Sequence, residues 1–139
     1  MTPADAAVKK GGMKPLVAVV DDDVSVRESL ESLIRSVGMA VKVFASAEEF
    51  LNSNGQNKPD CLILDVRMPG MSGIELHHYL MATNRKVPVI FITAHGTDDR
   101  ARSEAASDYT VAYLTKPFSE DELLDSVRAG LRLKSSTQI

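Results

Sequence analysis

Residues 60–73 read Asp-Cys-Leu-Ile-Leu-Asp-Val-Arg-Met-Pro-Gly-Met-Ser-Gly, and this stretch decides the fold. Its apolar run ends at the carboxylate of Asp65, and Pro69 with Gly70 predicts a turn before a helix opens at Ser72. A run with so little alternation is typical of a strand that is covered on both faces, as in a parallel sheet. Because open α/β sheets bind ligands at the carboxyl ends of their strands, we expect Asp65 to lie at a binding site.

The composition indicates one domain with a core of its own, since 44% of the 139 residues are hydrophobic. Acidic residues exceed basic residues by 19 to 16, so the excess of Lys and Arg that marks a nucleic-acid surface is missing. The single cysteine, Cys61, lies in an apolar run and is expected to be buried rather than nucleophilic. No apolar stretch has the length of a membrane span, and residues 1–15 lack a signal-peptide core. We therefore expect a cytoplasmic protein whose domain binds neither nucleic acid nor membrane.

Five apolar runs alternate with stretches of helical periodicity. The predicted strands are residues 16–20, 40–44, 60–65, 89–93 and 111–114. Four Ser and Glu pairs at capping-box spacing indicate helix starts, and they are Ser25 with Glu28, Ser46 with Glu49, Ser72 with Glu75 and Ser119 with Glu122. Residues 97–108 could form a further helix, although alanines are their only apolar residues.

This alternation of strands and helices predicts an α/β fold. We expect a doubly wound, five-stranded parallel sheet in the order 2-1-3-4-5, with five helices on its two faces. The predicted domain is residues 15–133. It would lie between a flexible arm at 1–14 and a frayed polar tail, or the start of a linker, at 134–139.

Polar side chains follow four of the five predicted strands at the point where each strand ends. They are Asp21 and Asp22, Asp65, Thr93 and Lys116. In the order 2-1-3-4-5 these strand ends are neighbours, so the side chains would meet at one edge of the sheet. Each residue alone has an ordinary interpretation, as a charge at a helix start, a β-forming residue or a surface lysine. Their occurrence at successive strand ends favours a shared site.

The chemistry of these residues points to phosphoryl transfer. Three carboxylates in one cleft would repel one another and need a cation. Carboxylate oxygens without a cluster of His or Cys favour Mg²⁺, or Mn²⁺, as that cation. An aspartate can accept a phosphoryl group by nucleophilic attack, and Lys116 with Thr93 would stabilise charge on the phosphoryl oxygens.

At these strand ends the chain resembles the response-regulator receiver domain, the phospho-acceptor half of two-component signalling. The matching motifs are Val-Val-Asp-Asp-Asp at 19–23, Leu-Ile-Leu-Asp-Val-Arg-Met-Pro-Gly-Met-Ser-Gly at 62–73, Ile-Thr-Ala-His-Gly at 92–96 and Tyr-Leu-Thr-Lys-Pro-Phe at 113–118. Each motif alone is modest evidence, but the set matches in order and spacing over about residues 15–133. Within the flavodoxin-like, CheY-like superfamily, the sequence around Asp65 and Thr93 is most similar to that of FixJ-type receivers.

The resemblance implies a role for each residue of the site. Asp65 would be the phosphorylated aspartate. The implied metal ligands are Asp21, Asp22, Asp65 and the backbone carbonyl of Arg67, with Asp21 acting largely through water. The implied switch and phosphate-binding residues are Thr93, Tyr113 and Lys116, and the peptide bond before Pro117 is implied to be cis.

Two further residues are expected to tune the lifetime of the phosphoryl group. Arg67 and His95 stand two positions beyond Asp65 and Thr93, where they would border the approach of hydrolytic water. Arg67 could also pair with phosphate oxygens, because its guanidinium group can donate two parallel hydrogen bonds.

The resemblance also implies partners for this domain. A sensor histidine kinase would donate the phosphoryl group to Asp65. An output domain, an effector protein or a second copy of the chain would dock on the face made by the fourth helix, the fifth strand and the fifth helix. Control of transcription through that partner is the implied outcome, and the domain itself would be a switch rather than an enzyme.

The chain departs from the family pattern just before the fifth predicted strand. Ser107-Asp108-Tyr109-Thr110 stands where receivers have a small or glycine-rich connection, and Ala112 stands where an acidic residue is frequent. The stretch from Thr93 to Lys116 is also one residue longer than usual. We expect these departures to affect the fourth helix and its surface rather than the phosphorylation site.

Two adjacent histidines, His77 and His78, are expected to lie on a solvated helix face and are not assigned a relay function. Neighbouring helix residues point in different directions, which makes them poor joint ligands.

Two other functions compete with the receiver interpretation. A Mg²⁺-dependent phosphatase of the haloacid-dehalogenase type also uses an aspartyl nucleophile, but it needs a second Asp two residues later, where this chain has Arg67. An interaction module with a degenerate receiver fold would not need the complete set of Asp21, Asp22, Asp65, Thr93 and Lys116. Labelling with acetyl phosphate would separate the three interpretations.

Overall fold

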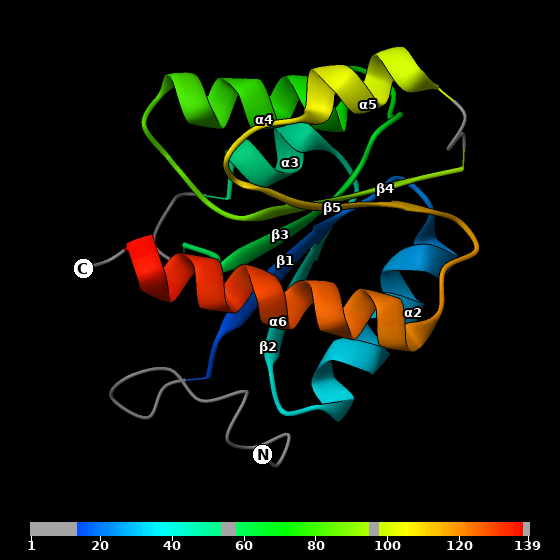
Figure 1. Ribbon diagram of the computed structural model, residues 1–139. Coiled ribbons are helices and arrows are strands. Elements are labelled where there is room, and N and C mark those ends of the chain that lie inside the picture. The colour runs from blue at the N-terminus through cyan, green and yellow to red at the C-terminus, as the bar shows by residue number, and fades with distance from the viewer. Residues whose placement is uncertain (1–13, 54–57, 95–97, 138–139) are drawn as a thin grey trace.

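The computed structural model describes residues 14–53, 58–94 and 98–137 as one parallel sheet with helices on both faces (Figure 1). The strands are β1 (Leu16–Val20), β2 (Ala40–Phe44), β3 (Cys61–Asp65), β4 (Val89–Thr93) and β5 (Thr110–Thr115). The helices are α2 (Val24–Ser36), α3 (Ala47–Leu51), α4 (Gly73–Ala82), α5 (Asp99–Ala105) and α6 (Glu120–Thr137). The strand order is β2-β1-β3-β4-β5, which confirms the predicted order. Helix α6 continues through residue 137, beyond residue 133, where a polar tail was expected to begin.

The sheet separates two hydrophobic cores because successive side chains of a strand point to opposite faces. On β3, Leu62 and Leu64 pack in the core beneath α3, α4 and α5, whereas Cys61 and Ile63 pack in the core beneath α2 and α6 (Figure 1). Every residue of β3 is buried, as the unbroken apolar run predicted. Cys61 is fully buried as expected, and burial raises the pKa of its thiol to about 12.

Serine side chains accept a backbone amide at three of the four predicted helix starts, Ser46, Ser72 and Ser119. The prediction for Ser25 with Glu28 is wrong. Asp23 caps α2 instead, and one of its carboxylate oxygens accepts from the amides of Ser25 and Val26 at 2.8 and 3.4 Å. Asp23 reaches both amides because α2 begins directly after it.

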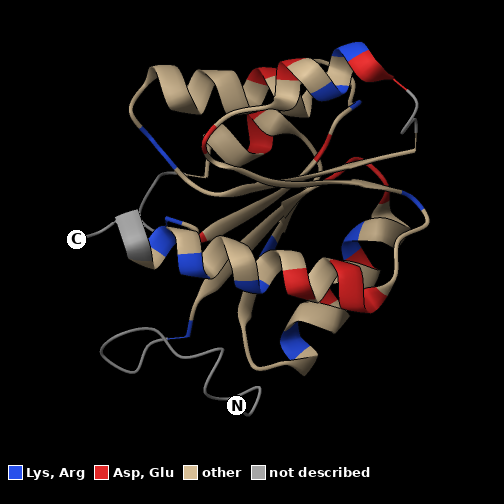
Figure 2. Ribbon diagram, in the orientation of Figure 1, with Lys and Arg blue, Asp and Glu red and all other residues tan. Residues whose placement is uncertain are grey.

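Helix α6 carries its charges in the order that a helix dipole favours (Figure 2). The first turn holds the acidic residues Glu120, Asp121 and Glu122, and the last turn holds Lys134. Figure 2 shows the same separation along the ribbon, with acidic residues near the start of α6 and basic residues further along it.

Strand β5 contains an irregularity that fits the extra residue expected between Thr93 and Lys116. Val89 is paired with Thr110, but the next residue of β4, Ile90, is paired with Ala112, so Val111 is the additional residue of a bulge. Regular pairing then resumes and ends with Thr93 opposite Thr115. The bulge thereby restores the register that places Lys116 at the carboxyl edge of the sheet.

Helix α5 is the helix with the least apolar anchorage, as its composition suggested. It spans Asp99–Ala105, which is shorter than the predicted range 97–108, and Ala105 is its one buried residue among those described. Burial of an alanine stabilises far less than burial of Leu or Ile, which contributes roughly 1.5–3 kcal/mol each. Polar contacts therefore have a larger share in holding α5 than in holding its neighbours.

The expectation that both histidines of α4 are solvated is wrong for His77. Its ring is fully buried and meets the edge of Phe91 on β4, with ring centroids 5.5 Å apart. Helix α4 packs on the sheet and also contacts α5, so its buried arc is wide enough to include His77 beside Leu76. His78 is exposed, and its Nε2 lies 2.8 Å from the carbonyl oxygen of Glu104 in α5.

The hydrogen-bond donors and acceptors around Ser107 determine the tautomer of His77. Thr110 Oγ1 donates to the carbonyl oxygen of Ala105 at 2.5 Å, so the 3.1 Å contact between Ser107 and Thr110 is donated by Ser107. The Ser107 hydroxyl then accepts from His77 Nε2–H at 2.8 Å. Nδ1 of His77 is left as a buried acceptor without a partner among the described residues. Burial lowers the pKa of His77 to about 4, and His78 acts in the same direction.

We predict a pH-dependent contribution of His77 to stability. The folded state keeps the ring neutral down to a pKa of about 4, whereas an unfolded histidine takes up a proton near pH 6.5. The unfolded state therefore binds more protons between these values, and stability falls as the pH drops through this window. His77→Gln keeps a donor for Ser107 and does not titrate. When the pH is lowered from 6.5 to 4, the free energy of unfolding of wild type, measured with urea, should fall by roughly 1–3 kcal/mol more than that of His77→Gln.

The matched control for this measurement is His78→Gln, which removes the exposed histidine of the same helix. In this variant the free energy of unfolding should change with pH as it does in wild type. The same pH dependence in wild type and His77→Gln would show that the buried ring is not the group responsible.

Candidate functional site

The predicted strand-end residues Asp21, Asp22, Asp65, Thr93 and Lys116 meet at the carboxyl edge of the sheet, where four parallel strands end. Asp65 and Thr93 are the last residues of β3 and β4, and Asp21 and Lys116 directly follow β1 and β5. Asp21, Thr93 and Asp65 are buried, with exposed fractions of 0%, 1% and 6%. Asp22 is exposed to solvent at the mouth of the site. A buried nucleophile candidate thus lies beneath an open, acidic entrance.

Three carboxylates form a compact cluster at this edge. Asp21, Asp22 and Asp65 each offer one oxygen atom, and these atoms lie within 4.8 Å of one another. Oxygen ligands of this kind, with no histidine or cysteine in the cluster, suit Mg²⁺ or Mn²⁺. The donor set therefore fits the hard cation that the sequence predicted.

Burial of Asp65 beside other carboxylates opposes its ionisation. Burial raises the pKa of Asp65 to about 7, the charge of Asp21 acts in the same direction, and Lys116 opposes both. Without a cation, Asp65 therefore holds a proton in part near neutral pH. A cation in the cluster would favour the carboxylate, which is the form that can act as a nucleophile.

Asp21 is held in place from several sides. One carboxylate oxygen accepts from the amide of Asp23 at 2.8 Å, and the other accepts from Lys116 Nζ at 3.1 Å. Arg27 donates to the carbonyl oxygen of Asp21 at 2.8 Å. The Lys116–Pro117 peptide bond is cis, and the amide of Lys116 donates to the carbonyl oxygen of Thr93 at 2.7 Å. The lysine ammonium is thus directed into the acidic cluster.

The loop from β3 to α4 is shaped by residues whose contribution the motif did not reveal. Gly70 has a positive φ of 76°, which glycine adopts without strain. The carboxylate of Glu48 on α3 accepts from the amide of Met71 at 3.1 Å. A Cβ atom on Gly73 would lie 2.1 Å from the carbonyl oxygen of Asp65, so only glycine fits there. Close packing of this kind has no signal in the spacing of the motif.

Arg67 lies at the border of the site, as its position after Asp65 suggested. Its amide nitrogen is 3.4 Å from a carboxylate oxygen of Asp65 and donates to it. Its guanidinium group is paired with Asp98 at 2.7 Å, a contact that joins the β3–α4 loop to the start of α5. The sequence did not indicate this pairing. His95, the other predicted lifetime residue, lies outside the described residues.

Tyr113 lies on β5 opposite Phe91 of β4, with ring centroids 6.2 Å apart. The guanidinium carbon of Arg102 on α5 lies 4.6 Å from the centre of the Tyr113 ring, close enough for a cation–π contact. The Tyr113 hydroxyl is buried without a partner among the described residues. Burial first, and then the charge of Asp98, raises the pKa of this hydroxyl.

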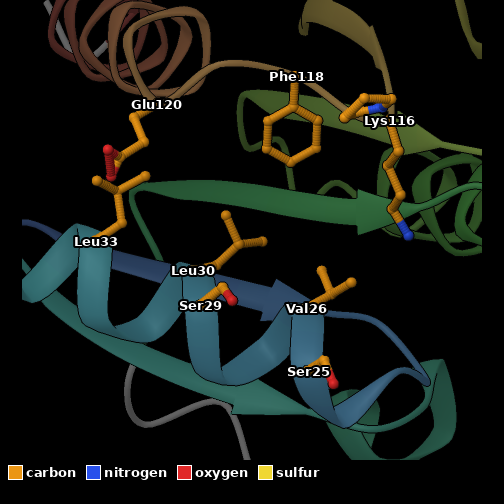
Figure 3. Close-up of a pocket in the computed structure, with 9 residues that line it drawn as sticks. Ser25, Val26, Ser29, Leu30, Leu33, Lys116, Phe118 and Glu120 are labelled. Atoms are coloured by element: carbon orange, nitrogen blue, oxygen red, sulfur yellow. The ribbon is translucent and has the colours of Figure 1, made fainter.

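A groove opens beside Lys116 between α2 and the start of α6 (Figure 3). Figure 3 shows Leu30 and Val26 rising from α2 toward Phe118, and Lys116 lies at one end. Leu33 and Glu120 lie at the other end. The groove therefore combines apolar walls with direct proximity to the acidic cluster.

Comparison with known proteins agrees with this arrangement. A family model described as the response regulator receiver domain matches residues 17–128. Response regulator protein TmoT of Ectopseudomonas mendocina is 45% identical over 118 residues, which cover 85% of this chain and 53% of that protein. Transcriptional regulatory protein FixJ of Azorhizobium caulinodans is 42% identical over 115 residues, which cover 83% of this chain and 54% of that protein. The chain thus spans about half the length of these curated relatives.

A solved structure shows the same fold. The response regulator StyR is 46% identical and superimposes with a TM-score of 0.78, over 91% of this chain and 63% of that one. No helix in the described part of the chain is long and apolar enough to cross a membrane. The family match, the relatives and the fold agree, and the chain belongs to the receiver domains of two-component response regulators.

Proposed function

We propose that this chain is a phosphorylation-controlled switch that accepts a phosphoryl group on Asp65 from a histidine of a sensor kinase. The observation that carries the proposal is the position of Asp65, buried at the end of β3 within the cluster that it forms with Asp21 and Asp22. Lys116 pairs with Asp21 there and is available to a phosphoryl oxygen. Thr93 ends the neighbouring strand.

The proposed transfer is a displacement at phosphorus. A carboxylate oxygen of Asp65 attacks the phosphorus of a phosphohistidine, a P–O bond forms and the P–N bond breaks. The imidazole nitrogen keeps the electron pair of the broken bond and takes up a proton. Lys116 and Thr93 would donate hydrogen bonds to the phosphoryl oxygens. Later attack by water at the same phosphorus would return the Asp65 carboxylate and release inorganic phosphate.

Asp21, Asp22, Asp65 and the carbonyl of Arg67 are the proposed ligands of Mg²⁺ or Mn²⁺. When bound, such an ion would neutralise charge among the carboxylates and on the phosphoryl oxygens. We propose that the domain acts only on its own phosphoryl group and is not an enzyme. Arg67 stands where an aspartyl phosphatase needs its second Asp, so the general acid for turnover of external esters is missing at that position.

The groove beside Lys116 is the proposed approach of the phosphoryl donor (Figure 3). A donor protein must bring its phosphohistidine past Lys116 to reach Asp65. The apolar side chains of Val26, Leu30 and Phe118 would receive one face of an amphipathic helix. A helix of the sensor kinase that carries the phosphohistidine fits this description.

We propose that the signal leaves through α5, β5 and α6, which are the fourth helix, fifth strand and fifth helix of the receiver. An output domain, an effector protein or a second copy of the chain would dock there. Since one relative is named as a transcriptional regulatory protein, the proposed outcome is control of transcription by that partner, while this domain itself binds no nucleic acid. Thr93 would move toward the phosphoryl group, and Tyr113 would fill the vacated space.

The labelling experiment tests the central proposal. With acetyl phosphate and Mg²⁺, intact mass spectrometry should show one added phosphoryl group in wild type and none in Asp65→Asn. Asp60→Asn is the matched control, since Asp60 lies at the opposite end of β3 and an Asn can still accept from the Leu16 amide. It should label like wild type. Labelling of Asp65→Asn, or sustained phosphate release from an external ester, would contradict the proposal.

A second prediction concerns the metal site. Removal of one of three crowded charges in Asp22→Ala should raise the thermal midpoint without Mg²⁺ by about 2–4 °C. The variant should also lose the stabilisation by added Mg²⁺ that wild type shows and should fail to label. Asp108→Ala removes an exposed aspartate outside the cluster and should change none of these properties. Normal labelling of Asp22→Ala in Mg²⁺ would remove Asp22 from the metal site.

A third prediction concerns the switch. Beryllofluoride with Mg²⁺ stands in for the phosphoryl group, and hydrogen exchange should then change most within residues 93–116. The reason is the weak anchorage of α5, whose one buried residue among those described is Ala105, together with the contact of Arg102 with the Tyr113 ring of β5. Asp65→Asn should show no change under the same conditions. If α2 or α3 changed most in wild type, the signal would leave by another face.

A further inference from the structure

An ion pair bridges the two loops that flank the entrance to Asp65. Arg67 Nη2 in the β3–α4 loop lies 2.7 Å from Asp98 Oδ2 at the start of α5. The side chains are 56% and 33% exposed, so the pair lies at the surface of the site rather than in the core. We refer to this contact as the Arg67–Asp98 bridge. It is the shortest of the ion pairs found among the described residues.

Asp98 uses its two carboxylate oxygens for different partners. Oδ1 accepts from the amide of Ala101 at 3.0 Å and thereby caps α5, while Oδ2 accepts from Arg67. The Ala101 amide, and then the charge of Arg67, hold the pKa of Asp98 below its usual range. Asp98 is therefore ionised at neutral pH and couples the position of Arg67 to the start of α5.

Arg67 is also within reach of chemistry at Asp65. Its amide nitrogen donates to Asp65 Oδ1, so the residue borders the carboxylate that would carry the phosphoryl group. A phosphoryl group brings more negative charge than one carboxylate and offers several oxygens to a guanidinium fork. Asp98 and a phosphorylated Asp65 would therefore compete for one cation.

We propose that Asp98 is a positioning residue that holds Arg67 away from the phosphoryl oxygens until Asp65 is modified. This inference rests on the proposed phosphoryl transfer to Asp65. On modification Arg67 leaves Asp98 for the phosphoryl oxygens, and the start of α5 loses its tie to the β3–α4 loop. The free energy of the bridge thereby opposes activation and sets how readily the switch responds.

The release of Asp98 would reach the switch aromatic through α5. Arg102 of α5 lies over the Tyr113 ring, so a shift of α5 changes the surroundings of that ring. The other end of α5 keeps its tie to α4 through the contact between His78 and the Glu104 carbonyl. Loss of the bridge thus frees one end of α5 while the other end stays attached.

The test is a titration of beryllofluoride in the presence of Mg²⁺, followed by NMR amide shifts in α5 and β5. The fluorine atoms stand in for phosphoryl oxygens. Asp98→Asn keeps the cap, because Asn is as good an N-cap as Asp, but it removes the charge that holds Arg67. The beryllofluoride concentration at the midpoint of the titration should fall by roughly two- to fivefold, the range expected from loss of a competing exposed ion pair. Asp99→Asn makes the same charge change one residue later and should leave the midpoint unchanged.

A double-mutant cycle separates this mechanism from a structural effect on α5. In an Arg67→Ala background, Asp98→Asn should have no further effect, because no cation remains to be released. The difference in titration midpoint between wild type and Asp98→Asn should also become smaller at high salt, because salt screens the bridge. An equal midpoint for wild type and Asp98→Asn would overturn the inference. An effect that persists without Arg67 would do the same.

Failure of the underlying function gives a different result. If wild type did not bind beryllofluoride with Mg²⁺ at all, this result would contradict both the proposed phosphoryl transfer and the role of Asp98. Binding by wild type with no difference in Asp98→Asn would overturn the role of Asp98 alone. Thermal midpoints of all variants, measured without ligand, show that each one is folded at the temperature of the titration.

Discussion

The burial of Asp65 beside Asp21 is the constraint on which the site depends. Two carboxylates at the ends of adjacent strands leave water together, and this placement raises the pKa of Asp65 to about 7. Lys116 offsets part of the charge by donating to Asp21 from β5, across the carboxyl edge of the sheet. Strand order, the bulge in β5 and the position of Lys116 all serve to bring this cation to the cluster. One more positive charge at this cluster would favour the ionised form of Asp65.

A second consequence of crowded charge is the way α5 is attached. The other helices of its layer bury large apolar side chains, such as Phe50 of α3 and Leu80 of α4. Helix α5 buries Ala105, with Ala101 partly buried against the same core, and it also contacts Arg67, His78 and Tyr113. Electrostatic contacts respond to a change of charge at Asp65 in a way that apolar packing does not. If Asp65 is modified as proposed, the least anchored helix would thus also be the helix most exposed to the change of charge.

Features with a strong local pattern could be predicted from the sequence. The unbroken apolar run before Asp65 predicted a central parallel strand, and the polar strand ends predicted the cluster that the structure brings together. Contacts between distant residues could not be predicted, because Arg67 and Asp98 are separated by 31 positions and each is an ordinary charged residue alone. His77 was misjudged because its burial depends on contacts outside α4, with Phe91 and Ser107, which no period within α4 reveals. The cap of α2 was misplaced because Asp23 competes with Ser25 for the same role.

Gly73 fixes the start of α4 against the end of β3. Since even a Cβ atom would collide with the carbonyl oxygen of Asp65, the first residue of α4 and the last residue of β3 are in direct backbone contact. The start of α4 is therefore seated directly against the residue proposed to carry the phosphoryl group. Under the proposed function, a displacement that begins at Asp65 would be taken up more easily by α5, which is joined to the β3–α4 loop through the side chains of Arg67 and Asp98. The absence of one side chain at position 73 would thus help to select the helix that responds.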